Sequence, residues 1–263
     1  MKNKIYILKL VLILFLFINN DSYSNDQFNF NVTELEITEN GNKVKGFKRG
    51  TITTDDGIKF DADEFDYDKL SNIFNAKGNI DIIDKVQNIE IYSDKAIYFK
   101  NDQKIFTEGN SKIIDKNNKI TIEADELNYN KLLNIFNASG SVKVHHKEKN
   151  IIIFADNATY LKNKNKIFTQ GNSKAINLGD NMSIEANDFE YNEISNIFIA
   201  TDDVKIIDVY KNFKLNTEKI TYLKNEEKIL TKGITSGVLE NKYNFNSKDL
   251  LLDRNLMTLS SLK

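Results

Sequence analysis

The sequence of 263 residues contains no cysteine, no proline and no tryptophan, and only two histidines. Without cysteine the chain can form neither disulfides nor thiolate metal sites, and two histidines leave little material for zinc, haem or catalytic-triad chemistry. No Gly-x-Ser-x-Gly, His-Glu-x-x-His or phosphate-binding glycine loop occurs. These absences argue against an enzyme, and we expect no catalytic residues, no cofactor and no bound metal.

Charge of either sign is not in excess, with 36 basic and 38 acidic residues. The lysines alternate with acids along the chain instead of forming a basic stripe, which argues against nucleic acid as a partner. A hydrophobic content of 40% is enough to form a folded core.

The N-terminal segment 1–24 has the features of a secretory signal peptide. Lys2 and Lys4 precede an apolar run of nine residues at positions 10–18, far fewer than the roughly 20 that a membrane-spanning helix needs. Small residues at Ser22 and Ser24 predict cleavage after Ser24. We therefore expect export to the periplasm, with a retained N-terminal anchor as the alternative.

The rest of the chain, 25–263, is predicted to be one domain built from a repeat of thirty-one residues. A tyrosine recurs in six copies, at Tyr67, Tyr98, Tyr129, Tyr160, Tyr191 and Tyr222. A second column holds acids or an amide, at Asp63, Asp94, Asp125, Asp156, Asn187 and Glu218. A third holds glycine in all copies but one, at Gly78, Gly109, Gly140, Gly171, Asp202 and Gly233. Three columns at the same spacing make chance agreement untenable.

Within each copy the apolar residues alternate with polar ones, as at Ile58, Phe60 and Ala62, which is typical of strands with one buried face. Between Ala62 and Phe65 this alternation slips by one position, and a strand break, corner or bulge is expected there. Each copy offers about four short strand segments and no helix. The imperfect copies at 28–37 and 245–252 are predicted to be edge strands.

Three groups of polar residues could form sites. The acid column could bind calcium, but one carboxylate per copy suits turn formation better than a cage of six to eight oxygens. Adjacent His145 and His146 would point to opposite faces of a strand and cannot share a metal; we expect both to be exposed. The tyrosine column could form a sugar-binding platform, but it is more typical of a core whose hydroxyl groups lie at the rim.

The motif Ile-x-Ala-Asp-x-x-x-Tyr, followed by Ile-Phe-x-Ala-x-Gly-x-Val, resembles the organic-solvent-tolerance (OstA-like) family. It stands at 122–129 with 135–142, and more loosely at 60–67 with 73–80. This family includes the periplasmic lipopolysaccharide carrier LptA and the periplasmic N-terminal domain of LptD. The resemblance covers residues 30–252 and leaves open whether the chain is an elongated carrier or an N-terminal region of LptD.

The resemblance implies an all-β, twisted antiparallel β-jellyroll, open at its ends, that shelters the acyl chains of lipopolysaccharide. Its partners would be lipopolysaccharide and other jellyroll proteins of a transport bridge, joined through the end strands, with head-to-tail homo-oligomers as a further expectation. The inward residues expected to bind lipid are Ile58, Phe60, Phe65, Phe74, Ile89, Ile91, Ile120, Ile122, Leu127, Phe136, Ile151, Ile153, Phe189 and Phe198.

Two other functions remain open from the sequence. A secreted structural or adhesive repeat protein would have a filled core and no lipid cargo. A carbohydrate-processing enzyme would need a cleft with paired carboxylates, and no pair stands out among acids that are spread through every copy. Lipid transport needs a continuous apolar passage between the inward columns, and the sequence leaves open whether the interior is such a slot or a filled core.

Overall fold

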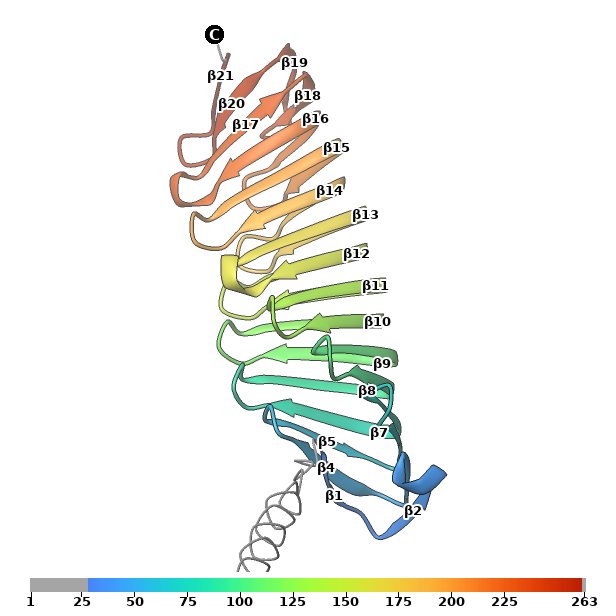
Figure 1. Cartoon of the computed structure of the whole chain (residues 1–263). Helices are drawn as coiled ribbons and strands as arrows, with labels where there is room; N and C mark the ends of the chain where they lie inside the picture. Colours follow the sequence, from blue (N-terminus) through green and yellow to red (C-terminus); the bar gives the residue numbers. More distant parts are fainter. Residues whose placement is uncertain (1–27, 262–263) are drawn as a thin grey trace, which may run out of the picture.

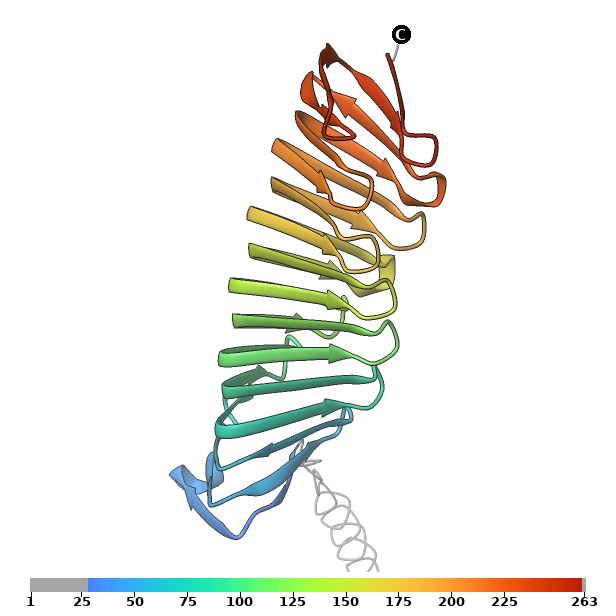
Figure 2. The same ribbon diagram turned by 180° about the vertical axis from the view of Figure 1, so that it is seen from behind.

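The computed structural model describes residues 28–261, so the predicted signal peptide lies outside the described residues. The described chain forms one antiparallel sheet of 21 strands, stacked into an elongated and twisted body (Figure 1, Figure 2). The two ends of the sheet do not meet, which confirms an open, all-β architecture. Within residues 28–261, no helix has the length and apolar character needed to span a membrane.

Ten long strands form the middle of the stack, and each pairs antiparallel with its neighbours in the chain. Residues that favour strands, chiefly isoleucine, phenylalanine, tyrosine and threonine, fill them. They are β7 (Ile73–Asp84), β8 (Ile89–Phe99), β9 (Lys104–Asp115), β10 (Ile120–Asn130), β11 (Ile135–His146), β12 (Ile151–Leu161), β13 (Lys166–Asn177), β14 (Met182–Asn192), β15 (Ile197–Asp208) and β16 (Phe213–Leu223).

Each long strand is interrupted near its middle by a shift in register. In the pairing of β7 with β8, for example, the shift falls between Lys77 and Ile80. The shifts align along the stack, and we call their line the spine. On one side of the spine lie the half-strands that carry the tyrosine column, which we call the tyrosine arm. The half-strands on the other side form the acid arm, which is named for Asp84, Asp115 and Asp208 at its free end; the acid column itself lies at the spine. The turns at the free ends of both arms form the mouth.

At the ends of the stack the two halves of each level are separate short strands. For example, β5 and β6 flank Asp63 and pair with the two halves of β7. The first set is β1 (Phe28–Asn31), β2 (Glu34–Thr38), β3 (Lys43–Phe47), β4 (Gly50–Thr54), β5 (Ile58–Ala62) and β6 (Glu64–Asp68). The last set is β17 (Lys228–Lys232), β18 (Ile234–Leu239), β19 (Tyr243–Lys248), β20 (Leu250–Asp253) and β21 (Thr258–Ser261). Short 3₁₀ turns occur at η1 (Glu39–Gly41), η2 (Lys162–Lys164) and η3 (Lys224–Glu226).

The predicted edge strands are confirmed at the N-terminal end and partly wrong at the other. β1 and β2, within residues 28–38, each pair on one side only. At the C-terminal end β19 is an edge, but β20 is covered by β21. The expected four segments per copy are in fact two strands that each bend at the spine, so every copy contributes to both arms of one sheet.

The spine explains the glycine and acid columns. Gly109 has a φ of +78°, and a Cβ there would lie 2.7 Å from Oδ2 of Asp94. The same carboxylate oxygen accepts a hydrogen bond from Nδ2 of Asn110 at 2.8 Å. The acid thus braces the bulge, as the turn-forming role predicted, and glycine is favoured because both the backbone conformation and the space disfavour a side chain. In the copy where Asn187 replaces the acid, Asp202 takes the glycine position with a φ of +65°.

A single apolar core runs along the stack between the two arms, from Phe28 to Leu252. The arms contact each other directly: the ring of Phe60 on the acid arm lies 4.8 Å from that of Phe74 on the tyrosine arm, centroid to centroid. The sheet is therefore folded over on itself, with its two inner faces packed together.

Replacing Gly109 with alanine tests the spine. We expect Gly109→Ala to lower the free energy of unfolding by about 1–3 kcal/mol, because a left-handed backbone must hold a Cβ against Asp94. Urea unfolding followed by circular dichroism measures the change. Gly179→Ala is the control, since its Cβ would approach nothing closer than 3.4 Å, and equal losses in both variants would contradict this account.

Candidate functional site

The residues predicted to bind lipid all lie in the core, and none is more than 5% exposed. They come from both arms and extend along the stack, so they form a lining and not a single pocket. The tyrosine arm contributes Phe65, Phe74, Leu127, Phe136, Phe189 and Phe198. The acid arm contributes Ile58, Phe60, Ile89, Ile91, Ile120, Ile122, Ile151 and Ile153.

The sequence leaves open whether the interior is hollow or filled, and in this structure it is filled. Side chains of the two arms fill the space between them, which is why residues such as Phe74 and Phe136 have no exposed surface. One apolar cavity, of about 20 Å³, lies near the mouth beside Ile151, Met182 and Phe198. A hydrocarbon chain can enter the interior only if the two arms move apart.

The mouth is the line along which they can part. The turns of the tyrosine arm are hydrogen-bonded through their backbones to one another, as Lys131 is to Gln103, and those of the acid arm likewise, as Lys116 is to Asn88. No backbone hydrogen bond within residues 28–261 joins one series of turns to the other. Side chains alone close the mouth, and we call this line of contacts the seam.

The seam is a series of rungs. Asp56 on the acid arm forms the first, and an acid-arm column that recurs once in every repeat forms those that follow: Asp84, Asp115, His146, Asn177 and Asp208. The aspartates serve both arms at once. Oδ1 of Asp115 accepts backbone hydrogen bonds from Asn117 and Asn118 in its own turn. Oδ2 accepts a hydrogen bond of 3.1 Å from the hydroxyl of Tyr160 on the opposite arm.

In the second and third rungs, a lysine on the tyrosine arm adds an ion pair to the aspartate. Nζ of Lys162 lies 2.9 Å from Oδ1 of Asp115 and donates to the backbone oxygen of Gln87. Both charged side chains are at least nine-tenths buried. In the rung before it, Lys131 lies 3.8 Å from Oδ2 of Asp84. Removing one partner of a buried pair of this kind costs about 3–5 kcal/mol, so each rung matters.

In the first rung, Asp56 accepts hydrogen bonds from Tyr98 at 2.7 Å and Lys131 at 3.0 Å. Burial alone would raise the pKa of Asp56, but hydrogen bonds from Thr54, Lys100, Tyr98 and Lys131 outweigh it and hold the pKa well below its ordinary value.

The last rung is closed by an arginine. Nη2 of Arg254 lies 2.5 Å from Oδ2 of Asp208, and the guanidinium also contacts Glu227 and the hydroxyl of Tyr222.

The fourth rung exchanges the residue types of the two arms. His146 stands where the second and third rungs have an acid, and Glu193 stands where they have lysine. His146 Nε2 and Glu193 Oε1 lie 2.5 Å apart, although the two atoms are not aligned as a hydrogen bond. The expectation that His146 is exposed is wrong: it is 3% exposed, because it replaces a seam aspartate that faces inward. His145 points to the other face, as expected, but it is half-buried there and not exposed.

The tyrosine column closes the core with its hydroxyl groups at the rim, as predicted. Burial raises the pKa of Tyr129, Tyr160 and Tyr191, with neighbouring acids as the second cause. The hydroxyl groups therefore stay protonated and available as donors across the seam. Because the rings are buried, they offer no platform to a sugar.

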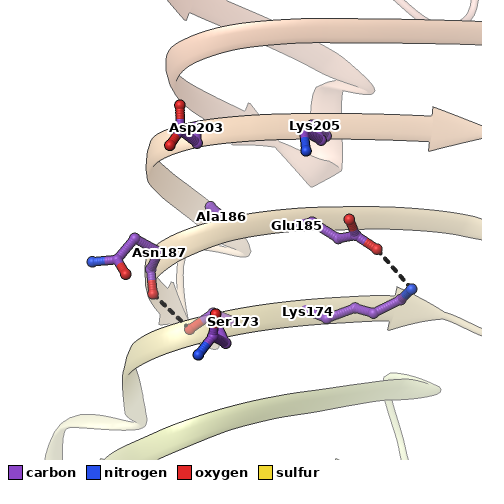
Figure 3. A pocket seen from close by; sticks show the side chains of 8 residues that line it. Ser173, Lys174, Glu185, Ala186, Asn187, Asp203 and Lys205 are labelled. Carbon is purple, nitrogen blue, oxygen red and sulfur yellow. Dashed lines mark hydrogen bonds and ion pairs between the residues drawn. The ribbon is translucent and has the colours of Figure 1, made fainter.

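The outer surface at the spine carries a polar depression of about 360 Å³ over β13, β14 and β15 (Figure 3). Its charges are partly paired, with Lys174 Nζ 2.7 Å from Glu185 Oε1. The hydroxyl of Ser173 donates to the backbone oxygen of Asn187 and lies 2.8 Å from the hydroxyl of Thr169. Within residues 28–261, no group of three or more histidine, aspartate or glutamate side chains could hold a metal ion.

The seam was not predicted from the sequence, although its signal was present. The position two residues after each repeat tyrosine holds a charged residue: Lys69, Lys100, Lys131, Lys162, Glu193 and Lys224. The reversed pair, His146 and Glu193, has the same separation along the sequence as Asp115 and Lys162. This spacing can be interpreted only when it is known which turns face each other across the mouth.

No protein-family model matches the chain, and no curated protein matches it. Among solved structures, the chain is similar to the crystal structure of LptH, described as the LptA homologous periplasmic component of the conserved lipopolysaccharide transport device from Pseudomonas aeruginosa. The match has a TM-score of 0.43 and 13% sequence identity, and it covers 47% of this chain and 96% of LptH.

The low pKa of Asp56 predicts a dependence of stability on pH. A carboxylate with a lowered pKa stabilises the fold above its unfolded pKa of about 3.9, and this contribution disappears as the pH falls toward the folded pKa. We expect wild type to exceed Asp56→Asn in free energy of unfolding at pH 7, and this difference to shrink below about pH 4. Urea titrations from neutral to acidic pH measure it. Asp102→Asn, at an exposed position, provides the control, and a difference for Asp56→Asn that does not change with pH would refute the assignment.

The reversed rung predicts an energetic coupling. His146→Asp alone places two carboxylates together, and Glu193→Lys alone places a lysine beside the histidine, so each should destabilise the fold. The double variant recreates the arrangement of Asp115 with Lys162 and should recover about 1–3 kcal/mol relative to the sum of the single changes. Urea unfolding of all four proteins at neutral pH gives this coupling; additive single effects would show that the two residues do not interact.

Proposed function

We propose that this protein is a non-enzymatic, periplasmic bridge protein that binds lipopolysaccharide and carries its acyl chains between the two arms toward the outer membrane. The observation that supports this proposal most strongly is the apolar interior that extends along the whole stack from Phe28 to Leu252. The sheet that encloses it is joined along the mouth by side chains only, within the described residues. The motif at 122–129 with 135–142, which resembles the OstA-like family, supports the same function.

The repeat suits transport, because successive levels present similar apolar residues to a chain that moves along the stack. On the tyrosine arm, Phe74 and Phe136 occupy equivalent positions two repeats apart. Hydrocarbon chains gain free energy from leaving water, at about 0.8 kcal/mol per CH₂ group, and similar levels would offer similar affinity. Movement in one direction would then have to be driven from outside this chain.

Loading requires the seam to part while the sheet remains paired. β11 and β12, for example, are joined over ten residue pairs, whereas the mouth has one rung in each repeat. Backbone hydrogen bonds contribute about 0.5–1.5 kcal/mol each, so the strand pairings together hold far more strongly than the seam does. Opening of the mouth therefore breaks no backbone hydrogen bond of the described chain, and an entering acyl chain can cover the apolar surface that the parting arms expose.

The unpaired edges of β1, β2 and β19 support partners at the two ends of the stack. An exposed edge offers backbone donors and acceptors to a strand of another protein, and a jellyroll added there would continue the interior. These partners would be other jellyroll proteins of the bridge, or further copies of this chain joined head to tail.

Photo-crosslinking tests the proposed cargo. A protein with Phe136→p-benzoylphenylalanine, produced in a Gram-negative host and irradiated, should form an adduct with lipopolysaccharide, because position 136 faces the interior. The same substitution at Lys77, which is exposed on the outer face of β7, is the matched control and should form little or none.

The competing function is a secreted structural or adhesive protein whose core stays closed. In that case neither position would capture lipid, and lipid extraction of the purified protein would recover none. Equal labelling at positions 136 and 77 would also contradict the proposal, since it would show contact with lipid at the surface only.

A further inference from the structure

The fifth rung of the seam is incomplete. Its acid-arm position is Asn177, while Tyr222 and Lys224 occupy the tyrosine-arm positions. The single side-chain oxygen of Asn177 accepts a hydrogen bond of 3.0 Å from the backbone of Gly179 in its own turn. An aspartate has a second oxygen for the opposite arm, and asparagine has only an NH₂ group there, which cannot accept from a tyrosine or pair with a lysine.

Neither Tyr222 nor Lys224, on the tyrosine arm of this rung, is hydrogen-bonded to Asn177. The hydroxyl of Tyr222 donates instead to Glu227 at 3.0 Å and contacts Arg254 of the next rung. The ammonium group of Lys224 forms neither a hydrogen bond nor an ion pair with any residue in 28–261. Its counterparts Lys131 and Lys162 each hold a carboxylate.

Charge and burial at Lys224 favour an anion. Burial lowers the pKa of Lys224, which Asp180 and Glu227 partly oppose and the cations Lys149 and Arg254 reinforce. Both acids also contact Arg254, and neither forms an ion pair with Lys224. Within residues 28–261, the ammonium group is therefore partly buried without a carboxylate in direct contact, and such a position favours an added anion.

An apolar cavity lies directly inside this rung. Asn177, Tyr222 and Lys224 line it at the mouth, and Ile151, Met182 and Phe198 line it toward the core. Its volume of about 20 Å³ has room for no more than a water molecule or a methyl group, so the cavity is a small packing defect and not a preformed lipid pocket.

We propose that the fifth rung is the port through which an amphiphile enters the interior, with its anionic head group held by Lys224 and its hydrocarbon chain directed past Met182 and Phe198. The occupant is a lipid with a phosphate head group. This inference rests on the proposed function, since it assigns the entry point for the cargo. The other rungs hold the mouth closed on both sides of the port.

Binding of dodecyl phosphate, measured by calorimetry below its micelle concentration, tests the port. Wild type should bind it, whereas inorganic phosphate, or dodecyl maltoside with the same chain and a neutral head, should bind at least tenfold more weakly. Asn177→Asp supplies the missing carboxylate and should weaken binding of dodecyl phosphate at least tenfold. Lys224→Met removes the ammonium group but keeps a long apolar side chain and should have a similar effect.

Two controls carry the same changes of charge on the outer faces of the arms. Asn137→Asp on β11 and Lys214→Met on β16 are exposed and should bind within twofold of wild type. Asn177→Asp should also be at least as stable as wild type in urea, so that loss of binding is not a loss of fold.

Binding that Asn177→Asp and Lys224→Met leave unchanged would overturn the port, and so would inorganic phosphate binding as tightly as dodecyl phosphate. Photo-crosslinking at position 136 separates the two proposals. If that position still captures lipopolysaccharide, the interior carries lipid that enters elsewhere; if it captures none, the proposed function itself has failed.

Discussion

The structure depends on buried carboxylates that accept hydrogen bonds from both arms at once. At Asp115, Oδ1 accepts from the backbone of its own turn and from Lys162 across the mouth, and Oδ2 accepts from Tyr160 across the mouth. These shared carboxylates join two arms that have no backbone hydrogen bond between their free ends within the described residues. A sheet that folds at its glycine spine would otherwise leave its apolar inner faces open to water. The seam thus closes the interior through side-chain contacts that can be broken without unpairing the sheet.

The two sides of each bent strand are consequently under different constraints. At the spine, a Cβ at Gly109 would meet Asp94, and only the copy that has Asn187 in the acid column carries a side chain, that of Asp202, at the equivalent position. At the mouth, the same geometry is satisfied by Asp115 with Lys162, or by His146 with Glu193. A protein that must open along one line and bend along another would be expected to distribute rigid and replaceable contacts in this way. The filled interior and the proposed lipid cargo are compatible only if the mouth opens.

The repeat made the fold predictable, because a column of residues at constant spacing fixes the equivalent positions before any coordinate is known. Period-two alternation placed Phe60, Phe74 and Phe136 inside, and the slip after Ala62 marked the spine. The seam could not be predicted in the same way. It joins residues 45 to 47 positions apart, and only the pairing of turns across the folded sheet brings Asp115 beside Lys162. His146 was misplaced because a polar side chain was expected to be exposed, although the alternation of Val142 and Val144 with His146 places it on the inward face.

Measuring the width of the mouth with and without lipid tests the central claim most directly. Because the chain has no cysteine, spin labels can be placed at Val86→Cys on the acid arm and Asn163→Cys on the tyrosine arm, both in exposed turns, and their separation followed by pulsed electron resonance. Labels at Leu132→Cys and Asn163→Cys, in neighbouring turns of one arm, provide the reference. Lipopolysaccharide should lengthen and broaden the first distance and leave the second unchanged. An unchanged first distance in protein that has captured lipopolysaccharide at position 136 would contradict the account.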